Sequence, residues 1–322
     1  MKTSDQISMD VFTIASSAKK HLDDDAISKT AAFIMSRMNE DGGFRGRSSS
    51  SDLYYTFFAL ATLASLGASK HISPVNSYLK KIDTHRFGFI DLYCLACTKP
   101  LLTYLKLPDK LKALALLTAR KNSMFTGRAA KELVGRLEDY RSMDGGYNQN
   151  TKNSKHGTVY ASFLACQAYD NLGLEIPDKK GILNSLEALK ASDNGYANQP
   201  GMAHGTTTAT AASGIMMMRL GGKFPQTVEK WLAGQLLPCG GFRASPQTPI
   251  ADMLSTSTAV LALRHVGHKF ESRQSIIDFV ESHWDDSGGF FGSMLDPVCD
   301  CEYTFYALLT LGCLLENSFS GN

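Results

Sequence analysis

Asp41-Gly42-Gly43-Phe44 is the first of five similar turns in this chain, and the repetition decides the fold. The others are Asp144-Gly145-Gly146-Tyr147, Asp193-Asn194-Gly195-Tyr196, Cys239-Gly240-Gly241-Phe242 and Ser287-Gly288-Gly289-Phe290. Each turn is followed by a polar loop and then by an apolar run. The last four turns recur at a period of roughly 50 residues, which indicates stacked supersecondary units that share one core.

Two kinds of helix are predicted to alternate along this repeat. The segments before the turns are amphipathic, as expected of outer helices with one buried face: 27–38, 133–140, 182–189, 228–236 and 276–283. The segments after the turns are apolar nearly all round, which predicts inner helices buried on most sides: 53–66, 159–172, 207–220, 255–266 and 302–315.

A further, degenerate repeat has the same order. A short amphipathic stretch at 76–81 precedes Phe87-Gly88-Phe89, and the apolar stretch 90–105 follows. With this repeat the sequence predicts six helix pairs, and the fold class is all-α: an α/α toroid with an inner and an outer ring around a central cavity. We expect residues 1–27 to form an N-terminal helical extension and residues 28–322 to form the toroid domain.

The composition excludes several classes of protein. The chain has 322 residues and a net charge of +2, without the basic patch of a nucleic-acid-binding protein. No apolar run approaches the ~18–20 residues of a membrane span, and the N-terminus lacks the pattern of a secretory signal. Seven cysteines, an odd number in a large chain, argue against a disulfide framework. We therefore expect a cytoplasmic protein.

The order of helix, Gly-Gly-Phe turn, loop and helix over residues 28–315 resembles the β subunits of protein prenyltransferases and the related squalene and oxidosqualene cyclases. The resemblance implies an apolar central cavity that receives an isoprenoid chain. In protein prenyltransferases, the rim of that cavity binds the isoprenoid diphosphate and a catalytic zinc ion.

One segment is similar to the diphosphate-binding part of that family. The stretch 200–205 (Pro-Gly-Met-Ala-His-Gly) resembles the segment whose histidine contacts the diphosphate, with one residue fewer before the histidine. The resemblance implies that His204 binds diphosphate at a helix N-terminus, which favours anions. A loop histidine without a ligand is the alternative. Arg45, Arg47 and Arg243 are further candidates for the diphosphate, although a solvated surface loop also explains Arg45 and Arg47.

The zinc ligands of protein prenyltransferases are largely missing. Asp252 matches the ligand aspartate, but Leu254 stands in place of the ligand cysteine and Tyr303 in place of the ligand histidine. The nearby stretch 299–302 contains ligand types, but its Cys-x-Cys without a histidine at family spacing is a weak signal. The resemblance therefore predicts no zinc, and it leaves magnesium open as a cofactor.

The cyclase motif is missing as well, because residues 254–259 keep its Thr-Ala and have no carboxylate. Class II cyclase protonation is therefore not expected. The remaining candidates for a rim acid or base are Asp252, Asp300, Glu302 and Tyr303. Four tyrosines on predicted inner helices could line the cavity or simply pack in the core: Tyr54, Tyr55, Tyr93 and Tyr160.

The sequence supports three functional hypotheses. The first is a divergent, zinc-independent prenyltransferase-like or terpene-cyclase-like enzyme that binds an isoprenoid diphosphate or another apolar small molecule. The second is a non-catalytic toroid that binds a lipid or a protein. The third is a β-like subunit that needs an α-subunit-like or homo-oligomeric partner. Nucleic acid is not an expected partner under any of them.

Overall fold

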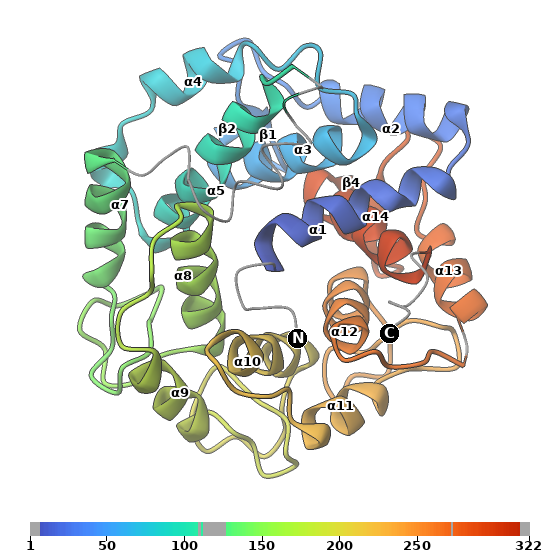
Figure 1. Cartoon of the computed structure of the whole chain (residues 1–322). Helices are drawn as coiled ribbons and strands as arrows, with labels where there is room; N and C mark the ends of the chain where they lie inside the picture. The colour runs from blue at the N-terminus through green and yellow to red at the C-terminus, as the bar shows by residue number, and fades with distance from the viewer. Residues whose placement is uncertain (1–6, 109–110, 112–126, 272, 316–322) are drawn as a thin grey trace. The chain divides into compact units, whose positions relative to one another are not determined.

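The computed structural model describes residues 7–108, 111, 127–271 and 273–315. Regular structure in these ranges is almost entirely helical (Figure 1), which confirms the predicted all-α class. The chain divides into two compact units. The first unit comprises the described residues of 1–9 and 83–228, and the second unit comprises those of 10–82 and 229–322.

The second unit holds the first and the last repeats. Its helices are η2 (Ser17–Lys20), α2 (Asp24–Met35), α3 (Leu53–Leu66), α4 (Val75–Lys81), α12 (Met253–His265), α13 (Arg273–Glu281) and α14 (Cys301–Leu315). Its strands form two antiparallel pairs, β1 (Phe44–Arg45) with β2 (Ser51–Asp52) and β3 (Phe290–Ser293) with β4 (Asp296–Asp300).

The first unit holds the middle repeats. Its helices are η3 (Thr84–Arg86), α5 (Phe89–Leu105), α7 (Arg128–Glu138), α8 (Val159–Asn171), α9 (Lys179–Ala188) and α10 (Thr207–Arg219). Two helices, α1 (Ile7–Ser16) and α11 (Gln226–Ala233), contain residues of both units.

Five of the six outer helices end one to three residues earlier than the sequence predicts, and α4 ends at Lys81 as predicted. Helix α2, for example, ends at Met35 instead of Met38, because Met38 forms an antiparallel bridge with Phe44 of the following turn. Arg141 and Tyr147 make the same bridge after α7. The residues between helix and turn thus pair their backbone groups with the turn and cannot continue the helix.

One buried hydrogen bond recurs in five repeats and joins each turn to its inner helix. The backbone N–H of the turn aromatic donates to a hydroxyl in the first turns of that helix. The pairs are Phe44 with Thr56 (2.9 Å), Tyr147 with Ser162 (3.0 Å), Tyr196 with Thr210 (2.9 Å), Phe242 with Thr256 (2.9 Å) and Phe290 with Thr304 (3.1 Å). Because an unpaired buried N–H costs about 1–3 kcal/mol, these hydroxyls hold the turns in place.

Each of the same inner helices begins at a side chain that accepts a hydrogen bond from a backbone N–H of the first helical turn. These capping residues are Asp52, Thr158, Thr206, Asp252 and Asp300. Such caps satisfy N–H groups that have no partner within the helix. The repeat therefore requires an oxygen-bearing side chain at this position whether or not it has a chemical role.

The turn glycines allow neighbouring repeats of the second unit to approach closely. Gly240 has φ +89°, and a Cβ there would overlap with the carbonyl of Ser275 in α13. Gly288 has φ +93°, and a Cβ there would overlap with the carbonyl of Lys29 in α2. A left-handed backbone at these positions favours glycine. The Gly288 contact places the last repeat against the first.

Helix α14 packs between α12 and α3 and also contacts the C-terminal part of α1 (Figure 1). Gly312 lies against the backbone of Ile14, and the centroid of the Phe12 ring is 6.2 Å from that of the Phe305 ring.

Within the described ranges, no helix combines the length and the apolarity needed to cross a membrane. The division into an extension of 1–27 and a domain of 28–322 stays a prediction.

Candidate functional site

Glu302 and Tyr54 meet at the start of two adjacent inner helices of the second unit, α14 and α3. The Tyr54 hydroxyl donates a hydrogen bond of 2.5 Å to Oε1 of Glu302. Burial raises the pKa of Glu302 to about 7; the Tyr54 hydrogen bond opposes this shift and the nearby Asp300 adds to it. Glu302 can therefore either give or take a proton near neutral pH.

Further aromatic rings pack beside Tyr54. The Tyr54 ring centroid lies 4.9 Å from that of Phe58 and 5.5 Å from that of Tyr55. The Phe58 ring in turn lies 5.5 Å from the ring of Tyr306 on α14. We call these four residues, Tyr54, Tyr55, Phe58 and Tyr306, the aromatic face. Its three tyrosines are partly exposed, so it is not simply part of the closed core.

Arg47 joins two loops beside the aromatic face. Its Nη1 lies 2.5 Å from Oδ2 of Asp296, and its Nε lies 3.7 Å from Oδ2 of Asp300. Asp296 begins β4 of the β3–β4 hairpin, and Arg47 follows β1, so the ion pairs connect the last repeat to the first. Burial raises the pKa of Asp300, while its hydrogen bond from the Tyr303 N–H and the charge of Arg47 oppose the shift. Arg47, which the sequence predicts as a diphosphate ligand, thus has carboxylate partners within the chain.

Arg45 and Arg243 occupy equivalent positions, each directly after a turn aromatic. Arg45 donates to Oδ1 of Asn39 (3.0 Å) and to the carbonyl of Ser36 (3.1 Å). Arg243 donates through Nε to Oε1 of Gln235 (3.0 Å). In both cases the guanidinium binds residues that follow the preceding outer helix or end it. The two arginines therefore have a structural role that the repeat explains.

Asp252 uses both carboxyl oxygens to begin α12. Oδ1 accepts from the backbone N–H of Ser255 and Oδ2 accepts from its hydroxyl, each at 2.7 Å. Burial raises the pKa of Asp252, and these hydrogen bonds oppose the shift, as does the nearby His283. The sequence interpretation missed His283. Its ring is buried, and among the described residues its Nε2 has no hydrogen-bond partner.

Tyr303 lies against the β3–β4 hairpin. A Cβ at Gly292 would overlap with the Tyr303 ring, so the ring and the hairpin backbone are in direct contact. Burial raises the pKa of Tyr303, and the carboxyls of Glu302 and Asp300 act in the same direction. Tyr303 therefore stays protonated at neutral pH and can only offer its hydroxyl.

His204 belongs to the first unit, where its Nδ1 lies 3.4 Å from Oδ2 of Asp193. His156 has the same relation to Asp144, at 3.5 Å. Both histidines stand two residues before the cap of an inner helix, and both aspartates begin a turn. This repeated aspartate–histidine contact gives His204 a place in the loop structure in addition to its predicted role.

The remaining predicted cavity tyrosines also lie in the first unit. The Tyr93 hydroxyl donates to Oε1 of Gln167 at 2.9 Å, and its side chain is buried. Tyr160 is 38% exposed, and its backbone N–H donates to Oδ1 of Asn198. The four tyrosines are therefore divided between the two units, and the rings of Tyr54 and Tyr55 pack edge to face against each other.

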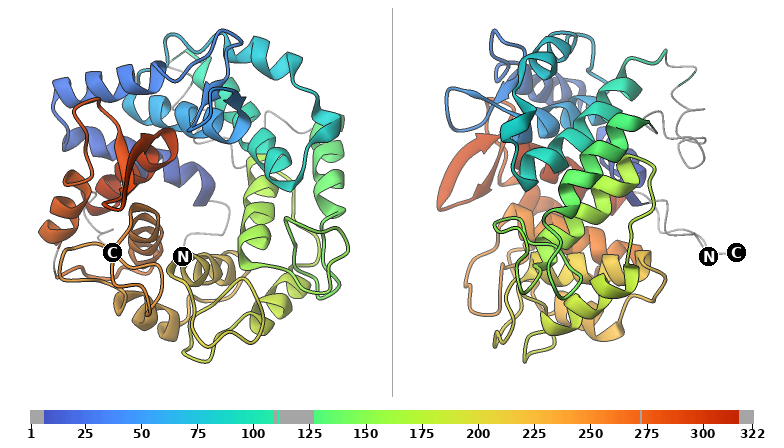
Figure 2. Two further views of the ribbon diagram at one scale, coloured as in Figure 1. Left: turned by 180° about the vertical axis from the view of Figure 1, so that it is seen from behind. Right: turned by 90° about the vertical axis from the view of Figure 1, so that its left-hand side faces the viewer.

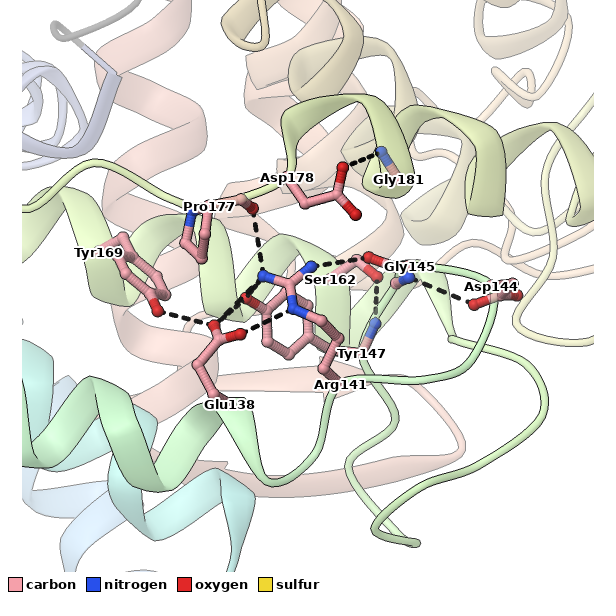
Figure 3. A network of polar contacts seen from close by, with 11 residues as sticks. Glu138, Arg141, Asp144, Gly145, Tyr147, Ser162, Tyr169, Pro177, Asp178 and Gly181 are labelled. Atoms are coloured by element: carbon pink, nitrogen blue, oxygen red, sulfur yellow. Dashed lines mark hydrogen bonds and ion pairs between the residues drawn. The ribbon is translucent and has the colours of Figure 1, made fainter.

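A polar network around Glu138 in the first unit was not predicted from the sequence (Figure 3). Its carboxylate accepts hydrogen bonds from Arg141 (2.7 Å), Tyr147 (2.5 Å) and Tyr169 (2.7 Å). Arg141 also donates to the carbonyls of Gly145 and Pro177. The available signal was a tyrosine, where three of the other four turns have phenylalanine, a short distance after a glutamate and an arginine. The network connects the turn to both flanking helices and is structural.

Comparison with known families identifies the relatives of this chain. The model of the prenyltransferase alpha-alpha toroid domain matches residues 3–90, 93–221 and 209–320. The chain belongs to this family. The predicted α/α-toroid class is thereby confirmed. A search of curated proteins gives no match. A crystal structure of a protein from Actinoplanes is similar over 90% of this chain and 97% of its own, with 14% identity and a TM-score of 0.48.

The residues of this toroid-family chain do not fit the zinc site of protein prenyltransferases. Leu254 offers no donor atom, and both carboxyl oxygens of Asp252 already accept hydrogen bonds from Ser255. Tyr303 carries a phenol whose pKa is raised, whereas zinc in proteins is bound by thiolate, imidazole and carboxylate. Among the described residues, no group of three or more His, Cys, Asp or Glu side chains is arranged to hold a metal ion.

Proposed function

We propose that this toroid-family protein is an enzyme that binds an isoprenoid ligand against the aromatic face, with Glu302 as the acid or base. The observation that carries the proposal is the hydrogen bond from Tyr54 to Glu302 beside that face. A carboxyl with a pKa near 7 suits general acid–base catalysis, because both of its protonation states are populated at neutral pH.

The three predicted rim carboxylates differ in their surroundings, and this difference favours Glu302. Asp252 and Asp300 cap α12 and α14, so each holds a helix end. Glu302 lies one residue inside α14, where the repeat requires no carboxylate. The repeat therefore does not explain the carboxyl of Glu302, and this favours a role for the carboxyl in ligand binding or catalysis.

The aromatic face supports an apolar ligand. Isoprenoid chains are bound by apolar and aromatic surfaces with a few polar groups that fix their orientation. Here Glu302 and the tyrosine hydroxyls supply the polar groups, and the rings supply the apolar surface. The predicted diphosphate role of His204, Arg45, Arg47 and Arg243 requires a diphosphate to compete with the internal partners of each.

Binding is tested by thermal unfolding of the full chain with geraniol, farnesol and geranylgeraniol and with their diphosphates, each with and without Mg²⁺. A ligand at about 100 times its dissociation constant stabilises the folded state by about 2.7 kcal/mol, which is visible as a shift in melting temperature. We expect at least one chain length to produce a shift. The absence of a shift with every compound would overturn the proposal.

Catalysis is tested with Glu302→Gln, which keeps an acceptor for the Tyr54 hydroxyl. We expect this variant to bind the isoprenoid and to lose at least about 100-fold in product formation, since general acid–base catalysis contributes about 10²–10⁴-fold. Glu132→Gln, at an exposed position on α7 of the first unit, is the matched control and should keep both properties. Equal product formation by Glu302→Gln and the wild type would exclude Glu302 as the acid or base.

A second candidate function is binding of a protein partner. The tip of the β3–β4 hairpin extends away from the helices of its unit (Figure 2), and Met294 and Leu295 at this tip are 68% and 78% exposed. Exposed apolar side chains of this size favour contact with another surface. Sedimentation analysis of the wild type and of Leu295→Ser tests a homo-oligomer: the variant should be monomeric if the wild type is not.

A further inference from the structure

The charges beside Glu302 are predominantly negative. The groups that act electrostatically on the neighbouring Tyr55 are the carboxyls of Asp300, Glu302 and Asp52 and the guanidinium of Arg47. Arg47 lies between Asp296 and Asp300, so its positive charge is already matched by carboxylates of the chain. An incoming anion would therefore meet carboxyl groups next to a cation that has its own partners.

Glu302 has room for one more donor. Among the described residues, the only hydrogen bond of its carboxyl is the one that Oε1 accepts from Tyr54. A carboxyl accepts through both oxygens, so Oε2 can accept from a ligand. A donor that carries a positive charge suits this position best, because a hydrogen bond to an ionised group is roughly twice as strong as one between neutral groups.

The rings favour the same kind of ligand. Aromatic faces attract cations that lie against them, because the face of the ring carries partial negative charge. Tyr54, Phe58 and Tyr306 come from two packed helices, and their rings form a connected group in which Tyr54 contacts the carboxyl of Glu302. A carboxyl beside such a group of rings is a suitable environment for an ammonium group at the end of an apolar chain.

We propose that the natural ligand of this site is an apolar chain that ends in an amine, bound as the ammonium between Glu302 and the aromatic face. This inference rests on the function proposed above and names the head group of the ligand. The ammonium donates to Oε2 of Glu302 and lies against the rings, and the apolar chain extends along the aromatic face. Such a ligand needs neither a metal ion nor any displacement of the Arg47 ion pairs.

The experiment compares three probes with one chain and different head groups: farnesylamine (a cation), farnesol (neutral) and farnesyl diphosphate (an anion). Calorimetric titration of the full chain at pH 7.5, below the critical micelle concentration of each probe, gives the affinities. We expect farnesylamine to bind at least about tenfold more tightly than farnesol, with the diphosphate weakest. Glu302→Gln should lose about tenfold in affinity for the amine and leave the affinity for farnesol almost unchanged.

Two control variants keep the test decisive. Asp139→Asn removes an exposed carboxylate of the first unit and should leave amine binding unchanged; an equal loss in this variant would show adsorption to acidic surface and overturn the inference. Phe58→Leu keeps most of the apolar volume and removes a ring. It should weaken amine binding more than farnesol binding, and it replaces Glu302→Gln if that variant fails to fold.

The outcomes separate the two proposals. If none of the three probes binds, the isoprenoid function itself fails. If farnesol or the diphosphate binds as tightly as the amine, the head-group inference fails while the isoprenoid function stands. Amine binding that survives in both Glu302→Gln and Phe58→Leu would also overturn the inference, because it would place the ammonium elsewhere.

Discussion

The hydroxyl of Tyr54 donates a hydrogen bond to Glu302, although 248 positions separate the two residues in the chain. Tyr54 stands near the start of the inner helix of the first repeat, and Glu302 near that of the last. They meet because the Gly288 turn of the last repeat packs against α2 of the first. The candidate site thus depends on contact between the two ends of the repeat series.

Replacement of Glu302 by glutamine should make the protein more stable above neutral pH. The pKa of Glu302 is raised from 4.5 in the unfolded chain to about 7 in the folded one. The wild type is therefore most stable relative to the variant below pH 4.5, and it loses stability as pH rises from there to about 7. At pH 8 the variant should gain about 1–3 kcal/mol, measured by urea unfolding from pH 4 to pH 8.

A gain for Glu302→Gln that is the same at every pH would contradict this prediction. Tyr54→Phe is the companion variant. It removes the donor that opposes the shift, so the pKa of Glu302 should rise further. The destabilisation of the protein at alkaline pH should then increase.

The Thr210 hydroxyl should matter more than its methyl group. Thr210→Val leaves the buried N–H of Tyr196 without an acceptor and should cost about 1–3 kcal/mol of unfolding free energy. Thr210→Ser keeps the hydroxyl and should cost less. Chemical denaturation gives the free energy of unfolding of both variants. An equal cost would assign the effect to packing and not to the hydrogen bond.

Glu138→Gln should destabilise the first unit strongly. Burial raises the pKa of Glu138, but the hydrogen bonds from Arg141, Tyr147 and Tyr169 outweigh it, and the net pKa lies below its usual value. The stabilisation is therefore present above the unfolded pKa of 4.5 and is lost as pH falls below it. At pH 7 the loss of this partner of Arg141 should cost about 2–4 kcal/mol.

The matched control for Glu138 is its neighbour Asp139, which forms an exposed ion pair with Lys152 at 2.9 Å. Asp139→Asn should cost much less than Glu138→Gln, because solvent screens exposed pairs. Thermal unfolding of the two variants at pH 7 makes the comparison. Similar shifts in both would show that the Glu138 network contributes no more than a surface pair.

Alanine should be tolerated at Gly267 and not at Gly240. Both have positive φ, so alanine strains the backbone at each by about 1–2 kcal/mol. Around Gly267 there is open space, whereas at Gly240 the new Cβ would overlap with the backbone of Ser275. Gly240→Ala should therefore lower the melting temperature clearly more than Gly267→Ala. Equal effects would mean that the Gly240 turn moves away from α13 at no cost.

The sequence by itself determined the repeat, the helical class and the inner helices. Helix α3 has the predicted bounds, 53–66, and α8 differs from its prediction only at its last residue. These features are local: apolar runs of helical length and glycine turns are readable without knowledge of the remote contacts. The predictions were less accurate for the ends of the outer helices, because bridges to the following turn terminate most of these helices.

The surroundings of each candidate residue depend on the tertiary structure. Asp252, Asp300 and Glu302 look alike in the sequence, yet the first two cap helices, whereas the third accepts a hydrogen bond from the remote Tyr54 and has a pKa raised to about 7. Arg47 is predicted from the sequence as an anion ligand, and in the structure it forms ion pairs with Asp296 and Asp300. The pKa and the charge balance of a group depend on burial and on neighbours remote in the sequence, and no local pattern contains that information.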